Sequence, residues 1–286
     1  MKAATNLPVL TCQAFLNHCQ ADHSLHLYSD FDGTLVPLQA DPMACHLSAS
    51  QAATLRALAA VPGVHITIVS GRRLVDLRSR IGIAGLGYVG NHGLEIATPS
   101  HNFVHPGALA LATRLAGWQS TLQVKLEPFT GVWIENKRLS LSIHYRTLAA
   151  CRHQDFMAVI ENYKGAITED GQLVISDAKQ VVEIRPNLGW TKGSAIQVVD
   201  DYINNDYING DHINEDHINK DSNRARRVYF GDNISDEDAF AQWQQDLTVL
   251  VGEANCQTHA NHRLGDYRQT HRLLDALRAR FDPDHH

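Results

Sequence analysis

Two aspartates separated by a single residue, Asp30 and Asp32, follow a short apolar stretch near the start of the chain. Phe31 lies between them, so both carboxylates can face the same space while its ring packs behind them. Gly33 then supplies the backbone freedom for a sharp exit. Two like charges this close at a partly buried site repel by about 4 kcal/mol at an effective dielectric of 20. The spacing therefore predicts a reactive pair accompanied by a cation; the alternative is an ordinary aspartate-rich turn after a strand.

A buried strand is expected to position this pair. Leu25, Leu27 and Tyr28 are apolar or aromatic and no proline interrupts them, which is typical of a strand inside a parallel sheet. Ligands of open α/β sheets bind beyond the carboxyl ends of the strands. The two aspartates therefore lie where such a sheet binds its ligand.

A second predicted strand ends in a hydroxyl residue. Residues 48–60 are typical of a helix, and Val64–Val69 is a β-branched stretch that runs into Ser70. A serine at a strand tip can donate a hydrogen bond to a phosphate oxygen, and a helix beginning near Arg73 adds backbone donors. Ser70 is alternatively only the N-cap of that helix. The aspartate pair upstream favours the phosphate role.

A third predicted strand, Gly87–Val89, runs into Gly90, Asn91, His92 and Gly93. Glycines on both sides of Asn91 and His92 indicate a tight loop that approaches another group closely. A histidine in a loop is usually only solvated. Its position at a strand tip makes His92 a candidate for substrate contact.

Lys192 is placed against local preference. Thr191 is predicted to cap a helix with a clear apolar stripe. The stripe consists of Ala195, Ile196, Val198, Val199, Tyr202 and Ile203. Lys192 then lies in the first turn, where a cation is unfavourable to the helix dipole. This indicates an anionic partner, so Lys192 is a candidate to bind a transferring phosphoryl group and balance the acids. A flexible surface lysine is the alternative.

Acids return at a fourth strand tip. Arg227–Phe230 predicts a buried strand that runs through Gly231 into Asp232. Asp232 can complete a metal shell, and Asp236 can order metal-bound waters or Lys192. Acids at a helix start usually only match the helix dipole. Because Asp232 and Asp236 come after a predicted strand that runs into Gly231, these acids are better interpreted as part of the same site as Asp30.

The pattern changes between about residues 105 and 186. Val132–Glu135 and Leu139–Arg146 are expected to pair as a β-hairpin. In the second strand apolar residues alternate with polar ones, which predicts a sheet with one packed and one polar face. Such a face suits a hydroxyl-rich ligand; a merely solvated face is the alternative. The other elements expected here are a helix over Ala108–Leu122, a separate short element over Val124–Glu127, a helix over Asp155–Lys164, and strands over Leu173–Ile175 and Gln180–Arg185.

Residues 201–220 repeat every five positions, with Asp at the first and Ile and Asn at the third and fourth. Five residues advance a helical side chain by about 140°, and an odd period reverses the face of a strand. Neither element buries this pattern. We therefore expect a surface excursion, a helix extension followed by a loop.

Composition bounds the class of protein. The 286 residues are 44% hydrophobic and 20% charged with a net charge of −6, typical of a soluble globular protein with one or two domains. Negative charge argues against generic nucleic-acid binding. The five cysteines lack Cys-x-x-Cys spacing and are expected to be reduced. No membrane span or secretion signal is visible, and a cytoplasmic protein is expected.

The string from Asp30 to Thr34 resembles the first motif of the haloacid dehalogenase-like phosphatases. The resemblance implies Asp30 as the nucleophile toward phosphorus and Asp32 as the proton donor to the leaving oxygen. It also implies Mg²⁺, held by the Asp30 carboxylate, the Asp32 backbone carbonyl and the later acid Asp232. The chemistry agrees, because a carboxylate is a known covalent nucleophile and a hard cation polarises phosphoryl oxygens.

Further motifs are similar to those of the trehalose-6-phosphate phosphatases, over roughly residues 28–251 without the repeats. These motifs are Ser70-Gly71-Arg72, Gly90-Asn91-His92-Gly93, Glu135-Asn136-Lys137, His144-Tyr145-Arg146, Glu183-Ile184-Arg185-Pro186 and Gly231–Phe240. The likeness implies catalytic roles for Ser70, Lys192 and Asp236. The substrate contacts it implies are Arg72, Asn91, His92, Glu135, Lys137, Arg146 and Glu183. The family usually has a second aspartate where this chain has Asn233, which removes a charge beside the metal.

We therefore expect an α/β protein with a Rossmann-like parallel-sheet core over residues 1–106 and 187–286. An α/β cap that sets substrate specificity is expected over 107–186, and a five-residue-repeat surface insertion over 201–221. A strand over Leu247–Val251 and a helix near Thr270–Phe281 are expected to close the core.

The expected reaction is Mg²⁺-dependent hydrolysis of trehalose 6-phosphate through an aspartyl-phosphate. Two alternatives stay open: a related phosphatase acting on mannosyl- or glucosyl-glycerate phosphate, and a non-catalytic sugar-binding or regulatory protein. We expect a monomer whose partner is a small sugar phosphate, without nucleic-acid or membrane partners.

Overall fold

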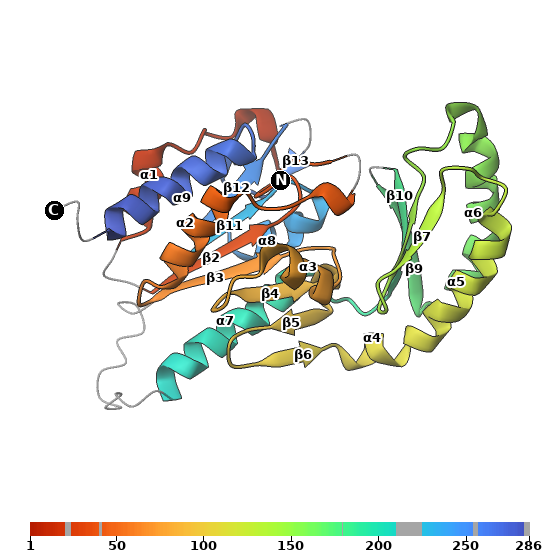
Figure 1. Ribbon diagram of the computed structural model, residues 1–286, viewed down its shortest axis with the longest axis horizontal. Coiled ribbons are helices and arrows are strands. Elements are labelled where there is room, and N and C mark those ends of the chain that lie inside the picture. Colours follow the sequence, from red (N-terminus) through yellow and green to blue (C-terminus); the bar gives the residue numbers. More distant parts are fainter. Residues whose placement is uncertain (21–23, 40–41, 179, 210–224, 254–256, 283–286) are drawn as a thin grey trace. The chain divides into compact units, whose positions relative to one another are not determined.

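The structure, a computed structural model, describes residues 1–20, 24–39, 42–178, 180–209, 225–253 and 257–282. The chain divides into two compact units (Figure 1). Unit 1 comprises Met1–Phe103 and Thr191–His286, and unit 2 comprises Val104–Trp190. Each unit has its own cluster of buried apolar side chains.

The described residues of unit 1 form an eight-stranded sheet in the order β14-β12-β11-β2-β3-β4-β5-β6 (Figure 1). The strands are β2 (Leu25–Asp30), β3 (Val64–Val69), β4 (Gly87–Gly90), β5 (Glu95–Ala97), β6 (Asn102–Val104), β11 (Arg226–Gly231), β12 (Leu247–Val251) and β14 (His262–Leu264). Neighbours from β14 to β4 are parallel, and β4 pairs antiparallel with β5. In chain order, β3 and β4 are added on one side of β2, and β11 and β12 are added later on its other side. The switch point, where such sheets bind ligands, therefore lies between β2 and β11.

Helices pack on this sheet. They are α1 (Cys12–His18), α2 (Ala49–Ala59), α3 (Leu74–Ile81), α7 (Lys192–Asn209), α8 (Glu237–Gln242) and α9 (Tyr267–Phe281). Helix α9 contacts both α1 and α2, and Figure 1 shows the three together. Buried residues of α1, α2, α3 and α9 and of β2, β3, β11 and β12 form one apolar cluster. Short elements complete the unit: β1 (Lys2–Ala3), which pairs with β13 (Gln257–Thr258), and the 3-10 helices η1 (Ala4–Asn6), η2 (Pro42–Ala44), η3 (Asn91–Gly93) and η6 (Ile234–Asp236).

Side-chain caps explain where two of the predicted helices begin. Ser48 and Gln51 form a capping box at the start of α2, with each side chain bonded to the backbone of the other residue. The Ser194 amide donates to Thr191 Oγ1 at the start of α7. Ser48 is thus the N-cap of α2, and the predicted N-cap Thr191 of α7 is confirmed.

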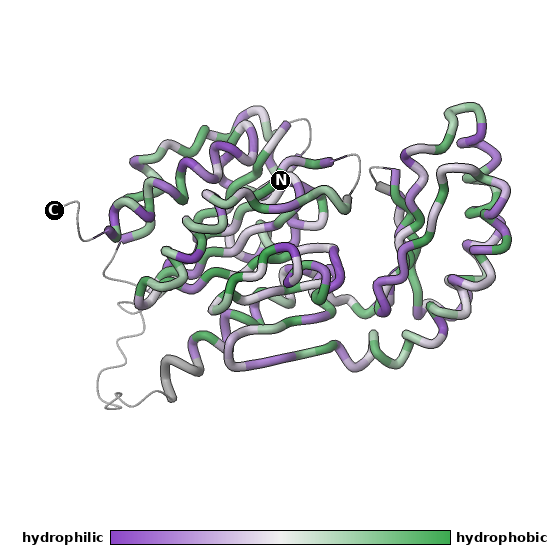
Figure 2. The backbone as a smooth tube through the Cα atoms, viewed as in Figure 1, coloured by the Kyte–Doolittle hydropathy of each residue, from purple (hydrophilic) through white to green (hydrophobic). Residues whose placement is uncertain are grey.

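Unit 2 is built on an antiparallel sheet. In its described residues four strands follow the order β7-β8-β10-β9. The strands are β7 (Trp133–Asn136), β8 (Leu141–His144), β9 (Leu173–Ala178) and β10 (Val181–Pro186), and the helices are α4 (Pro106–Ala110), α5 (Ala112–Leu126), η4 (Ala150–Arg152) and α6 (His153–Thr168). Helices α5 and α6 contact the sheet and each other. Figure 2 shows apolar and polar stretches alternating along both helices, as expected for helices with one face on a core.

The β-hairpin prediction is confirmed, because β7 and β8 pair antiparallel with Glu135 opposite Ser142. The prediction of a separate element over Val124–Glu127 is wrong. Helix α5 continues to Leu126, because Leu122 and Leu126 are both buried at a spacing of four residues. Val124 points away from that face and is 67% exposed.

Helix α7 extends into the five-residue repeats and ends at Asn209. The predicted helix extension is confirmed to that point, and the predicted loop beyond it falls on residues 210–224, outside the described residues. The ring of Tyr202, in the first repeat, stacks on His101 at 4.3 Å between centroids. Among the described helices, none combines the length and apolar character needed to cross a membrane.

Candidate active site

The predicted residues converge at the switch point of unit 1. Asp30 is the last residue of β2, and Asp232 follows β11, its parallel neighbour. Lys192 is the first residue of α7. Its Nζ donates to Asp30 Oδ1 at 2.6 Å and to Asp236 Oδ1 at 2.8 Å. Residues far apart in the chain thus meet through one ammonium group.

Lys192 is almost fully buried, with 3% exposure, so the alternative of a surface lysine is excluded. Burial acts to lower the pKa of Lys192, but the charges of Asp236 and Asp30 outweigh it and the pKa is raised. The lysine is therefore held in its charged form. Its place at a helix start, unfavourable to the dipole, is compensated by two carboxylates.

Asp236 is fully buried and accepts three hydrogen bonds. Oδ1 accepts from Lys192 and from the Tyr229 hydroxyl at 2.8 Å, and Oδ2 accepts from the Asn233 amide at 3.0 Å. These donors fix the carboxylate that orients the lysine. The Asn233 side chain accepts from the Ile234 amide and caps η6.

Tyr229 is a site residue that sequence reasoning missed. It lies inside β11 and is fully buried. Burial raises the pKa of its hydroxyl, and the neighbouring Asp236 and Asp30 add to that rise, so the hydroxyl is a donor. The one available signal was a tyrosine between Val228 and Phe230, two residues before Gly231.

Asp30, Asp232 and Asp236 form an acidic cluster. Each offers one carboxylate oxygen, and these oxygens lie within 4.8 Å of one another. Burial raises the pKa of Asp30; Lys192 opposes that rise, while Asp236 and Asp232 add to it. Three carboxylates and one ammonium leave a charge of −2 when all are ionised. A hard divalent cation with oxygen ligands fits this donor set.

Gly33 permits the close approach of this cluster to the backbone. Its φ is +93°, and a Cβ at this position would lie 2.2 Å from Asp232 Oδ2. A larger residue would therefore push the Asp232 carboxylate away. Phe31 is fully buried in the core behind the aspartates, as its alternation with them predicted.

Asp32 is paired with Arg72. The guanidinium donates from Nε to Oδ2 at 2.7 Å and from Nη2 to Oδ1 at 2.8 Å, a bidentate pair. The cationic neighbour expected for the two aspartates is therefore supplied twice, by Lys192 for Asp30 and by Arg72 for Asp32. Substrate contact by Arg72 stays a prediction.

Ser70 follows β3 directly and is 2% exposed. Its Oγ accepts from the Arg72 amide at 3.1 Å. Helix α3 has Arg73 as its N-cap, so the alternative of Ser70 as the N-cap of that helix is wrong. Its phosphate contact stays a prediction.

The loop after β4 is tight, as its glycines predicted. Asn91 and His92 have φ values of 53° and 57°, and a Cβ on Gly71 would lie 2.6 Å from the His92 ring. Asn91 is fully buried, and its Nδ2 donates to Glu95 Oε2, which also accepts from the Leu74 amide, both at 3.1 Å. Glu95, which sequence reasoning missed, thus ties the loop to α3. Substrate contacts by Asn91 and His92 stay predictions.

The polar face of the unit 2 sheet carries most of the other predicted ligands. Lys137 Nζ lies 3.5 Å from Glu183 Oε1, which also accepts from Ser142 Oγ at 3.3 Å. Glu135 Oε2 lies 2.9 Å from His144 Nε2. On β10, Glu183 lies between the buried Val182 and Ile184, so polar and apolar side chains alternate along this strand.

The His144 ring stacks on Trp133 at 3.9 Å between centroids, and Trp133 is 44% exposed. Trp133 was not singled out from the sequence, although aromatic faces often bind the apolar faces of sugar rings. Arg146 follows β8 and is exposed.

The fold and the site define the class of the protein. A parallel sheet with acids at the carboxyl ends of its strands, together with an inserted α/β unit, is the architecture of the haloacid dehalogenase-like proteins. Two solved structures share the fold. The C-terminal domain of trehalose-6-phosphate phosphatase from C. albicans has a TM-score of 0.75 at 22% identity, covering 96% of this chain and 98% of that one. A trehalose-6-phosphate phosphatase related protein has a TM-score of 0.71 at 21% identity, covering 88% and 96%.

Sequence comparison identifies the family within this class. The trehalose-phosphatase family matches residues 28–271. The trehalose-phosphate phosphatase of Mycobacterium marinum is 34% identical over 216 residues, 75% of this chain and 50% of that protein. The chain thus spans half the length of this curated relative. It belongs to the trehalose-phosphatase family.

Proposed function

We propose that this protein hydrolyses trehalose 6-phosphate to trehalose and inorganic phosphate. The observation that supports this most is the buried contact of Lys192 with Asp30 and Asp236, beside Asp232, in a chain of the trehalose-phosphatase family. Phosphate-ester hydrolysis needs a nucleophile, a proton donor and positive charge near the phosphoryl oxygens. Unit 1 holds a candidate for each.

Asp30 is the proposed nucleophile. Its carboxylate attacks phosphorus, the bond to the sugar oxygen breaks, and an aspartyl-phosphate forms. Asp32 donates a proton to the departing oxygen and then takes a proton from the water that hydrolyses the intermediate. Lys192 and Ser70 donate hydrogen bonds to the phosphoryl oxygens. Asp236, held by three donors, orients Lys192.

Mg²⁺ is the proposed metal. The Asp30 and Asp232 carboxylates and the Asp32 backbone carbonyl would hold it, because hard oxygen donors suit this ion. Asp236 stands in the same cluster, but its hydrogen bonds assign it to Lys192. When bound, the ion would screen the surplus negative charge and polarise the phosphoryl oxygens.

Unit 2 is the proposed specificity cap, corresponding to the 107–186 segment expected from the sequence. Glu135, Lys137, Arg146 and Glu183 are the proposed sugar ligands. Carboxylates accept from sugar hydroxyls, and ammonium and guanidinium groups donate to them. The contacts of Glu183 with Lys137 and Ser142 support a pre-organised polar face.

We further propose that the enzyme is a cytoplasmic monomer. Cys12, Cys19, Cys45 and Cys151, the cysteines within the described residues, are unpaired, which suits a reducing compartment. Burial raises the pKa of Cys19 to about 12, so this thiol is unreactive.

A substrate panel tests the proposal. Phosphate release from the full chain with Mg²⁺ is measured on trehalose 6-phosphate, glucose 6-phosphate, and mannosyl- and glucosyl-glycerate phosphates, with Asp30→Asn as the blank. We expect kcat/KM for trehalose 6-phosphate to exceed the others by at least about 100-fold. A preference for a glycerate phosphate would assign the chain to the related phosphatases. Absence of metal-dependent turnover on every ester would leave only a sugar-binding role.

A further inference from the structure

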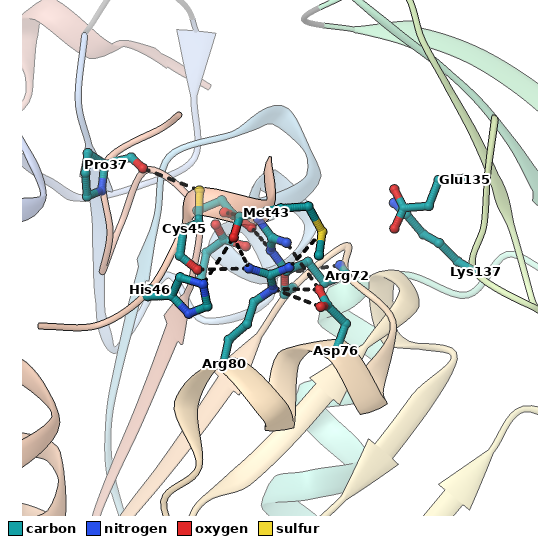
Figure 3. A network of polar contacts seen from close by, with 12 residues as sticks. Pro37, Met43, Cys45, His46, Arg72, Asp76, Arg80, Glu135 and Lys137 are labelled. Atoms are coloured by element: carbon teal, nitrogen blue, oxygen red, sulfur yellow. Dashed lines mark hydrogen bonds and ion pairs between the residues drawn. The ribbon is translucent and has the colours of Figure 1, made fainter. Parts of the chain in front are cut away.

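A chain of ion pairs runs from Asp32 through helix α3. Arg72 is bidentate on Asp32, and its Nη1 also donates to Asp76 Oδ2 at 3.2 Å. Arg80 Nε in turn donates to both oxygens of Asp76, at 2.9 and 2.8 Å. Figure 3 shows Arg72, Asp76 and Arg80 linked in this order. Asp76 and Arg80 lie about one turn apart on one face of α3, and Arg72, which precedes the N-cap Arg73, reaches Asp76 from outside the helix.

Arg80 anchors the far end of this chain. Its side chain is 3% exposed, and Nη1 donates to the backbone carbonyls of Met43 and Cys45 at 2.9 and 3.1 Å (Figure 3). A buried arginine side chain that donates to acceptors on several sides is held in a single conformation. Asp76, which bonds it twice, is therefore fixed as well.

Through these bonds Arg80 holds the Met43–Cys45 segment against helix α3. The Arg72 guanidinium, which is 11% exposed, is clamped between Asp32 and Asp76.

We propose that Asp76, braced by Arg80, is a positioning residue that holds Arg72 in the plane required to aim the Asp32 carboxylate at the leaving oxygen. This inference rests on the proposed function, in which Asp32 is the proton donor. Without the Asp76 carboxylate, Arg72 keeps Asp32 as its charged partner but loses the acceptor that fixes its opposite edge. The pair can then turn together, and proton transfer requires close alignment.

The chemistry of the leaving group provides a specific readout. A sugar alkoxide is strongly basic and leaves only if it is protonated as the bond to phosphorus breaks. A p-nitrophenolate leaves without a proton. A misaligned Asp32 therefore slows the sugar phosphate and spares the aryl phosphate, whereas general damage to the site slows both.

The test compares Asp76→Asn with the wild-type full chain, in Mg²⁺, on trehalose 6-phosphate and p-nitrophenyl phosphate. We expect kcat on the sugar phosphate to fall about 10- to 50-fold with KM nearly unchanged, and kcat on the aryl phosphate to fall less than about 3-fold. Asp155→Asn is the matched control, because Asp155 is also a first-turn helix aspartate paired with an arginine, Arg152. It should change neither rate.

Both substrates are assayed on the same sample, so an unfolded fraction cancels from the ratio of the two rates. Asp76→Glu, which keeps the charge but displaces it, should show the same selective loss at a smaller size. Equal losses on both substrates, or no loss, would overturn the positioning role. If the wild-type enzyme does not hydrolyse trehalose 6-phosphate, the proposed substrate is wrong. The sugar phosphate that the enzyme does hydrolyse is then compared with p-nitrophenyl phosphate in the same way.

Discussion

Lys192 and Asp200 lie about two turns apart on helix α7, and each is buried among opposite charges. Around Lys192, carboxylates outnumber the single ammonium. Around Asp200 the donors dominate: His26 Nδ1 lies 2.6 Å from Oδ1, the Tyr28 hydroxyl donates to Oδ1 at 3.2 Å, and Arg227 Nε donates to Oδ2 at 3.0 Å. One helix thus carries both a site with surplus negative charge and a site without it.

The carboxylates respond in opposite directions. Burial acts to raise the pKa of Asp200, but hydrogen bonds from His26 and Arg227 outweigh it and the pKa falls below its ordinary value. At Asp30, burial and the neighbouring acids prevail over Lys192, and the pKa is raised. The Asp200 network is satisfied by the protein alone and is structural. The Lys192 site retains surplus negative charge, and a carboxylate with a raised pKa in such a cluster is typical of a functional site.

The largest effect is expected at Asp30. Asp30→Asn should reduce kcat by more than about 10⁴-fold, because the amide cannot form an acyl phosphate. Circular dichroism should show an unchanged fold, since the substitution removes one of three crowded negative charges. Near-normal phosphate release from this variant would refute Asp30 as the nucleophile.

Lys192→Met should lower kcat by about 10²- to 10³-fold, because it removes a charged donor to the phosphoryl group. It should also lower the free energy of unfolding by about 3 kcal/mol, since buried carboxylates lose their partner. Steady-state kinetics and urea unfolding measure the two effects. Lys164→Met, which removes a half-exposed lysine from α6, is the control and should change neither. A fully active Lys192→Met enzyme would make this lysine structural, like Asp200.

Asp200→Asn should lower stability without lowering activity. We expect about 3 kcal/mol of lost stability, because His26 and Arg227 lose a buried charged acceptor, with kcat changed less than about 3-fold below the melting temperature. A loss of activity larger than the loss of folded protein would show that the two networks are not separate.

The stability that Asp200 contributes depends on pH in a defined direction. Its pKa is depressed in the folded state, so the contribution is complete above the unfolded-state pKa of about 3.9 and is lost as the pH falls toward the folded-state value. The difference in unfolding free energy between wild type and Asp200→Asn should therefore be constant near neutrality and shrink below about pH 4. Urea titrations at several pH values measure it; a difference that grows on acidification would contradict the assignment.

Mg²⁺ should raise stability modestly, by about 2.7 kcal/mol at a concentration 100 times Kd, and EDTA should reverse the gain and stop turnover. Asp232→Asn should lose most of this gain, whereas Asp200→Asn should keep it, because only the first alters the acidic cluster. Thermal melts with and without Mg²⁺ measure the shift. Equal shifts in both variants would place the metal elsewhere.

Local pattern predicted much of unit 1. The strands β3 and β12 have the predicted bounds, because each is an uninterrupted apolar or β-branched run in a parallel sheet. The strands β5 and β6, three residues each, are too short for a period to be visible. Helix α5 runs four residues beyond the predicted end at Leu122, because Leu122 and Leu126 are both buried at helical spacing.

Lys192 was predictable because its residue type conflicts with local preference, whereas the aspartates were predictable from their spacing and their place at strand tips. Lys192 in a first helical turn indicated an anionic partner, and two buried carboxylates are present. Tyr229 and Glu95 gave no such conflict, because a strand tyrosine and a strand glutamate are ordinary. Their roles depend on which segments lie beside them, and side-chain contacts between distant segments leave no periodic trace.

The amino-acid sequence by itself determined the strand tips, the helix caps and the acids placed on them, since these depend on residue type within a few positions. Only the tertiary structure decided which charge meets which: that Lys192 bonds Asp30 and Asp236, that Arg72 holds Asp32 and Asp76, and that Asp200 is balanced by His26 and Arg227. The physical reason is that charge pairing in a buried site depends on distance and desolvation in three dimensions, and neither is encoded in the spacing along the chain.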